Sequence, residues 1–150
     1  MIFSRITDAN LIPRVLVEDN KDRNYSVDKF YEMMGTLLLT PQGLVNCGEY
    51  LNLILDEVSK EIIGYVWFSL NFLEEEIFIN TISVMKEHRQ NGDILNKVFE
   101  ELKKTFLSTK FKVVRTCSTR IEWHKKNGFV PSKNVLLEYD LTKGECDGQD

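Results

Sequence analysis

The chain has 150 residues, of which 43% are hydrophobic and 28% are charged, and its formal net charge is −4. This is the composition of an ordinary globular domain, and a chain of this length can bury a core. A negative net charge argues against a general nucleic-acid binder, and no run approaches the roughly 18 apolar residues that a membrane span needs. We therefore expect a globular protein whose partners include neither nucleic acid nor a membrane.

The cysteines and the N-terminus bear on the compartment. Cys47, Cys117 and Cys146 are an odd number without metal-like spacing, so we expect free thiols and no metal site. The first residues lack the charged-then-apolar layout of a signal peptide. Both features favour a reducing, cytoplasmic environment.

The N-terminal third predicts one strand and two helices. Residues 3–6 form a short candidate strand. Cap residues at Asp8 and Asn10, with Pro13 in the first turn, predict a helix with an apolar side. After a polar break, Ser26 and Lys29 with the apolar residues that follow predict a second helix, which ends near residues 40–43, at a Thr-Pro-Gln-Gly sequence.

The pattern then changes from helical to strand-like. Residues 50–55 and 62–70 predict an antiparallel hairpin joined by the polar turn 56–61. Residues 62–68 are nearly all apolar, which indicates a central strand that is covered on both faces.

The middle of the chain predicts a strand, a turn and a helix in succession. The strand covers residues 77–84, the polar turn ends in Gly92, and an amphipathic helix runs from about Asp93 to Leu107. A glycine-bearing turn between a strand and a helix is a common way to present backbone N–H groups to a phosphate.

The last part predicts a strand over 111–117, a short helix over 119–127 closed by Gly128, and a final strand over 135–141. Residues 143–150 form a polar tail. Eight basic residues but only one acid, Glu122, lie between Lys103 and Lys126. This run is either a solvated face or a site for an anionic ligand.

These elements predict an α/β domain over residues 1–142, with a mixed sheet of about six or seven strands and about four helices. Their order and two motifs resemble the GNAT acyltransferase superfamily. Residues 84–94, Val-Met-Lys-Glu-His-Arg-Gln-Asn-Gly-Asp-Ile, are similar to the family's pyrophosphate loop. Residues 123–129, Trp-His-Lys-Lys-Asn-Gly-Phe, are similar to its late helix, which ends in Gly-Phe.

The resemblance implies that the chain binds acetyl-coenzyme A or another acyl-coenzyme A. The pyrophosphate would lie on the loop formed by Arg89, Gln90, Asn91 and Gly92. Arg89 would add a charged contact, and Gly92 would allow close approach of the backbone. Pantetheine would pair with the backbone near Ile82 and Val84, and Arg120 would reach a phosphate.

The resemblance also implies direct acyl transfer to an amine. Because only the free amine attacks, a base is needed, and Glu76 lies about where the family's glutamate does. His124 replaces the family's tyrosine and would protonate the leaving thiolate. The acceptor pocket would lie at the first two helices, where Tyr31, Met33 and Met34 are candidate lining residues. Alternatively, Glu76 belongs to a solvated acidic turn, and His124 to an inert surface helix.

Four positions depart from the family pattern: Asp93, Ile94, Arg120 and His124. Each departure weakens cofactor binding or catalysis. Residues 118–128 also resemble GNAT-like internal virion proteins of short-tailed phages. A second interpretation is therefore an inactive structural protein that binds protein partners in an assembly such as a virion. A sensor that binds acyl-coenzyme A without turnover lies between the two.

Overall fold

The computed structural model describes residues 1–20, 23–37, 48–89, 93–118, 121–133 and 135–142. The chain divides into two compact units, Met1–Thr119 and Arg120–Asp150. The first unit contains the whole sheet, and the second contains one helix and an extended stretch. The predicted tail, Cys47, Cys146 and the 40–43 turn lie outside the described residues.

The first unit is built on a five-stranded mixed sheet with strand order β1-β2-β3-β4-β5. Neighbouring strands are antiparallel, except for β4 and β5, which are parallel. The prediction of a mixed sheet is confirmed, whereas six or seven strands was wrong. The strands are β1 (Ile2–Arg5), β2 (Glu49–Leu55), β3 (Ile62–Asn71), β4 (Glu76–Val84) and β5 (Val113–Thr116).

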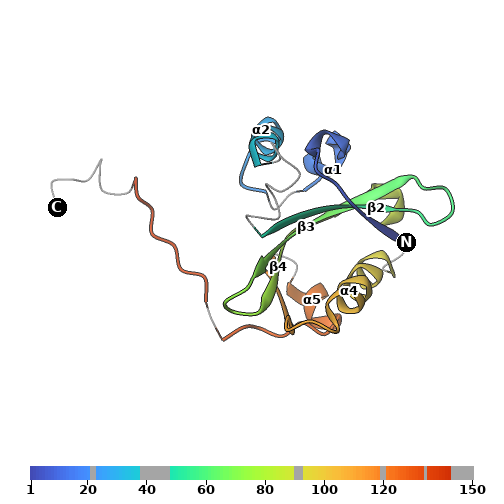
Figure 1. Ribbon diagram of the computed structural model, residues 1–150. Helices are drawn as coiled ribbons and strands as arrows, with labels where there is room; N and C mark the ends of the chain where they lie inside the picture. Colours follow the sequence, from blue (N-terminus) through green and yellow to red (C-terminus); the bar gives the residue numbers. More distant parts are fainter. Residues whose placement is uncertain (21–22, 38–47, 90–92, 119–120, 134, 143–150) are drawn as a thin grey trace. The chain divides into compact units, whose positions relative to one another are not determined.

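Among the described residues there are four α-helices, as expected, and two 3₁₀ helices. They are η1 (Ala9–Leu11), α1 (Arg14–Glu18), α2 (Val27–Leu37), η2 (Lys86–His88), α4 (Asp93–Phe106) and α5 (Ile121–Lys126). In the first unit, α1 and α2 pack on one face of the sheet and α4 packs on the other (Figure 1).

The first predicted helix is split into two short pieces, so its prediction as one helix was wrong. Asp8 caps η1 by accepting a hydrogen bond from the Asn10 N–H. Ile12 is extended, and α1 begins only after Pro13. A proline disfavours helical geometry at the residue before it and has no N–H to continue the helix, which explains the break.

The second helix and the hairpin, which the sequence also predicts, are confirmed. Ser26 Oγ accepts a hydrogen bond from the Lys29 N–H and caps α2. The hairpin forms between β2 and β3, and its turn is held by the Asp56 carboxylate, which accepts hydrogen bonds from the Val58 and Ser59 N–H groups, each at 2.9 Å.

The sheet separates two hydrophobic clusters, and β3 contributes to both. Under α1 and α2, Leu16, Phe30 and Met34 pack with Tyr65 of β3. Under α4, the buried residues include Val66 and Phe68 of β3, with Ile54, Ile77, Ile79, Val98 and Leu102. This confirms that β3 is a central strand covered on both faces.

A β-bulge in β4 changes which side chains face which cluster. Ile79 lies opposite Phe68 and Thr81 lies opposite Trp67, so Asn80 is an extra residue in β4. Before the bulge, Ile79 faces the cluster beneath α4. After it, Thr81 and Ser83 share the face of Trp67 and Tyr65, on the side of α1 and α2.

The predicted last strand is not formed. Residues 135–141 carry no strand assignment, although their side chains alternate in character. A strand requires backbone pairing with a neighbouring strand, and none of the strands in the described part of the chain pairs with this stretch. The large hydrophobic side chains of this stretch are therefore exposed, namely Val135, Leu136, Leu137, Tyr139 and Leu141.

Candidate functional site

The C-terminal half of β4 has an open edge. Parallel pairing with β5 runs from Glu76 opposite Val113 only as far as Ile79 opposite Thr116. The bulge follows at once. From there to Val84, β4 is paired with β3 alone among the described residues.

The direction of the backbone groups along this edge follows from one hydrogen bond. The Met85 N–H donates to the Ile63 carbonyl at 2.7 Å, toward β3. Alternate residues of a strand direct their N–H and C=O groups to opposite sides. Ile82 and Val84 therefore direct theirs away from β3, to the open edge, and these are the residues expected to pair with pantetheine.

The segment after β4 leads to the start of a long helix. Met85 is followed by η2, and α4 begins at Asp93. Gln90, Asn91 and Gly92, which the motif predicts on the pyrophosphate, lie outside the described residues. The predicted order of strand, turn and helix is confirmed around them.

Arg89 has two partners in the structure. Its Nε donates to the Val84 carbonyl oxygen at 2.8 Å, on the open edge of β4. Its Nη2 donates to Asp19 Oδ2 at 2.9 Å and forms an ion pair there. Asp19 is the C-cap residue of α1. Sequence reasoning predicted Arg89 but not Asp19.

The branched side chain of Ile94 packs against the hydrophobic cluster beneath α4, with Val98 and Leu102 of the same helix. The position that departs from the family motif therefore supports the core. The apolar face of α4 is confirmed by the burial of Val98 and Leu102.

Glu76 lies at the start of β4, in the half that is paired with β5. Its carboxylate forms an ion pair with the Arg115 guanidinium, and its side chain is only 16% exposed. It is therefore not part of a solvated acidic turn. To act as a base, Glu76 would take up a proton while facing Arg115, a partner that sequence reasoning did not find.

His124 lies on α5, in the second unit. Its ring contacts Phe129 edge-on, with 5.1 Å between centroids. Gly128 has a φ of 90°, and the Phe129 N–H donates to the His124 carbonyl, so the predicted closure by Gly128 is confirmed. Arg120 lies outside the described residues, and the pairing of Glu76 with His124 in one site stays a prediction.

A shallow hollow of about 290 Å³ lies at the N-terminal helices, lined by Asn10, Ile12, Arg14 and Tyr31. Tyr31 was an expected lining residue, and its hydroxyl donates to the Ile12 carbonyl at 2.7 Å. Of the other two candidates, Met34 is buried in the core and Met33 is exposed.

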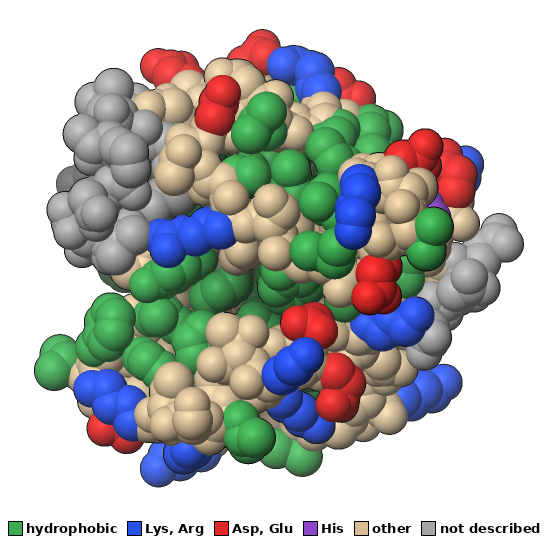
Figure 2. All heavy atoms as spheres, turned by 45° about the vertical axis from the view of Figure 1, so that its right-hand side comes forward, with side chains coloured by type: hydrophobic (Ala, Val, Ile, Leu, Met, Phe, Trp, Pro, Cys, Tyr) green, Lys and Arg blue, Asp and Glu red, His purple; other side chains and the backbone are tan. Residues whose placement is uncertain are grey.

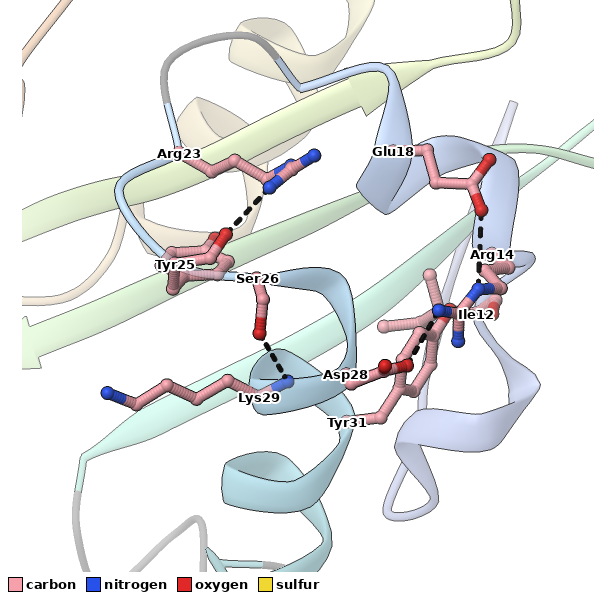
Figure 3. A network of polar contacts seen from close by, with 9 residues as sticks. All are labelled: Ile12, Arg14, Glu18, Arg23, Tyr25, Ser26, Asp28, Lys29 and Tyr31. Carbon is pink, nitrogen blue, oxygen red and sulfur yellow. Dashed lines mark hydrogen bonds and ion pairs between the residues drawn. The ribbon is translucent and has the colours of Figure 1, made fainter.

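The charged groups of this hollow form a network, which Figure 3 shows. Arg14 donates to Asp28 at 2.6 Å and pairs with Glu18 at 3.2 Å. The Asp28 hydrogen bond raises the pKa of Arg14, and burial raises the pKa of Tyr31. Both side chains stay in their usual charge states near neutral pH, so the hollow presents a guanidinium whose charge is balanced by two carboxylates.

The described surface carries both signs of charge. On the face drawn in Figure 2, Lys and Arg side chains are interspersed with Asp and Glu. Within the described part, no cluster of three or more His, Cys, Asp or Glu side chains is placed to hold a metal ion. None of the described helices is long and apolar enough to cross a bilayer. Cys117 is exposed and not in a disulfide.

Comparison with solved structures identifies the fold. A predicted acetyltransferase of Clostridium acetobutylicum with acetyl-CoA superposes with a TM-score of 0.65 at 15% identity, over 96% of this chain and 98% of that one. This is a GNAT-like fold. No sequence-family model and no curated protein matches the chain in sequence.

Two further GNAT neighbours differ in the acceptor that their names state. A chimera of the spermidine N-acetyltransferase SpeG from Vibrio cholerae and hSSAT has a TM-score of 0.65 at 16% identity, over 93% of this chain and 86% of that one. An aminoglycoside 6'-N-acetyltransferase of Acinetobacter haemolyticus has a TM-score of 0.59 at 19% identity, over 93% and 98%. At these identities the likeness establishes the fold alone, since one fold hosts many functions.

Proposed function

We propose that the protein is an N-acyltransferase that binds acetyl-coenzyme A, or another acyl-coenzyme A, and transfers the acyl group directly to an amine. The observation that carries this proposal is the open edge of β4. The backbone groups of Ile82 and Val84 are directed outward there, as pairing with the amides of pantetheine requires.

The pyrophosphate would lie next to this edge, on the loop that follows. Arg89 already reaches the edge through its bond to the Val84 carbonyl. The loop residues Gln90, Asn91 and Gly92 would supply backbone N–H groups at the start of α4, where the helix dipole favours an anion. We also assign a phosphate contact to Arg120.

In this proposal Glu76 is the general base and His124 the general acid. Glu76 would accept the proton of the amine, directly or through water, and His124 would protonate the departing thiolate. The amine acceptor would enter past α1 and α2, near the hollow lined by Arg14 and Tyr31. The spermidine and aminoglycoside enzymes of this fold make polyamines and aminoglycosides the first acceptors to test.

Calorimetric titration with acetyl-coenzyme A, followed by an assay of thiol release with these amines, tests the proposal. We expect binding that weakens by about tenfold or more in Arg89→Ala, because a charge-assisted hydrogen bond is lost. Glu76→Gln should lower the rate of acyl transfer by about 10²-fold. Glu74→Gln, in the exposed turn before β4, is the matched control and should keep the rate. Absence of binding at roughly millimolar cofactor would refute the proposal.

The exposed stretch 135–141 favours a second candidate, a protein of this fold that acts by binding other proteins. Five large hydrophobic side chains in seven residues are exposed there, and such stretches mark interaction sites. In that case the chain would be a structural component, such as a virion protein. It would give no heat with acetyl-coenzyme A, and Arg89→Ala would change nothing beyond stability.

A further inference from the structure

The ion pair between Arg89 and Asp19 has no role in the proposed acyl transfer. The guanidinium that would bind the pyrophosphate is already paired with a carboxylate of the same chain. Asp19 Oδ2 accepts a hydrogen bond from Arg89 Nη2 at 2.9 Å, across 70 positions of sequence. The exposed fractions of the two side chains are 40% for Arg89 and 32% for Asp19.

The position of Asp19 explains why it needs a cation. It is the C-cap residue of α1, and its N–H bonds to the Val15 carbonyl. The C-terminal end of a helix carries partial negative charge, so a carboxylate there is unfavourable unless a cation offsets it. Arg89 is that cation in the structure.

A second contact fixes the same end of α1. The buried Ser83 hydroxyl, on β4, donates to the Leu16 carbonyl at 2.7 Å. The end of α1 is therefore tied to the end of β4 through Ser83 and, through Arg89, to the segment that precedes α4. Of these two contacts, only the ion pair of Arg89 with Asp19 is charged. An anionic ligand would therefore compete with Asp19 for the Arg89 guanidinium.

We infer that Asp19 is an internal counter-ion that occupies Arg89 until the phosphates of the cofactor replace it. This inference rests on the proposed function. Asp19 sets the affinity for the cofactor because every phosphate that reaches Arg89 displaces a carboxylate. The displacement also removes one of the two contacts described above at the C-terminal end of α1, the helix whose Arg14 lines the hollow at the N-terminal helices. Asp19 is thus a positioning residue that acts through Arg89.

Asp19→Asn tests the inference, because it keeps the size of the side chain and removes its charge. We expect acetyl-coenzyme A to bind about two- to fivefold more tightly than to the wild type, the ratio that an exposed ion pair supplies. Asp19→Glu should restore the wild-type affinity. In the Arg89→Gln background, Asp19→Asn should have no effect on affinity.

Glu87→Gln is the matched control. Glu87 is exposed on η2, two residues from Arg89, and its loss changes the net charge by the same amount. If Glu87→Gln tightens binding as much as Asp19→Asn does, the effect is long-range electrostatics and the inference is overturned. Weaker or unchanged binding in Asp19→Asn would also overturn it, since Asp19 would then orient Arg89 for the ligand or take no part.

Failure of the proposed function has a different signature. Neither the wild type nor Asp19→Asn would bind acetyl-coenzyme A, while the coupling of Asp19 and Arg89 would still appear in thermal unfolding of the two single variants and the double variant.

Discussion

At the scale of single residues, the contacts that define the candidate site join positions far apart in the sequence. Arg89 was predicted from its motif, whereas its partner Asp19 lies in a polar break that carries no local signal. In the same way, Glu76 was predicted, but its ion pair with Arg115 requires β4 and β5 to be paired. Sequence patterns identify candidate residues for phosphate binding and for proton transfer. Which carboxylate pairs with which guanidinium depends on the fold.

Asp56 provides a prediction on pH at this scale. The N–H groups of Ser59 and Val58 donate to its carboxylate and hold its pKa below the ordinary value of 3.8. A depressed folded-state pKa stabilises the protein above the unfolded-state pKa, and this contribution is lost as the pH falls through the folded-state value.

We therefore expect Asp56→Ala to lower the free energy of unfolding at neutral pH, and the difference from the wild type to shrink steadily below about pH 4. Urea unfolding across this range measures it. Val58→Ala, which changes an exposed side chain of the same turn that carries no titratable group, is the control and should show none of this pH dependence. A difference that is constant down to about pH 2 would contradict the account.

At the scale of elements, local patterns were sufficient for the hairpin, for α2 and for the strand, turn and helix around residues 77–107. They failed at two points. Pro13 divides the first helix, because its effect on Ile12 outweighs the helical spacing of the apolar residues. The stretch 135–141 has strand-like residues, but strand formation depends on a partner that the pattern does not specify.

The β-bulge at Asn80 was not predicted either. The residues before it keep the ordinary alternation of a strand and give no sign that an extra residue follows. It separates the half of β4 that pairs with β5 from the half with the open edge. At the C-terminal end of β4, the backbone leaves little space for a side chain at Gly64 of β3. A Cβ atom at Gly64 would lie 2.5 Å from the Ser83 carbonyl oxygen and 3.3 Å from Val84 Cα.

Gly64→Ala should therefore push β4 away from β3 next to the open edge and destabilise the protein by about 1–3 kcal/mol. Gly35→Ala is the control. An added Cβ at Gly35, within α2, meets nothing within 4 Å, so alanine should stabilise the helix by about 0.5–1 kcal/mol. Denaturant unfolding of both variants measures the two effects, and a Gly64→Ala variant as stable as the wild type would contradict the close approach.

At the scale of the whole molecule, the mixed α/β architecture and its GNAT-like character were predicted from the order of the elements and two motifs. Structural comparison supports the same fold at identities of 15–19%. Function does not follow from the fold, because three of the four positions that depart from the family pattern, Asp93, Ile94 and His124, lie in its two functional motifs, and the fourth, Arg120, lies just before the second motif. At Ile94 the departure has a structural role, since its partly buried side chain packs against the cluster beneath α4.

The central claim is that the open edge of β4 binds the pantetheine of an acyl-coenzyme A. Amide hydrogen exchange, followed by NMR with and without acetyl-coenzyme A, tests it most directly. We predict that the Ile82 and Val84 amides exchange more slowly in the presence of the cofactor. The Met85 amide, already bonded to Ile63, serves as the internal reference and should not change. Unchanged exchange of Ile82 and Val84 at saturating cofactor would contradict the claim.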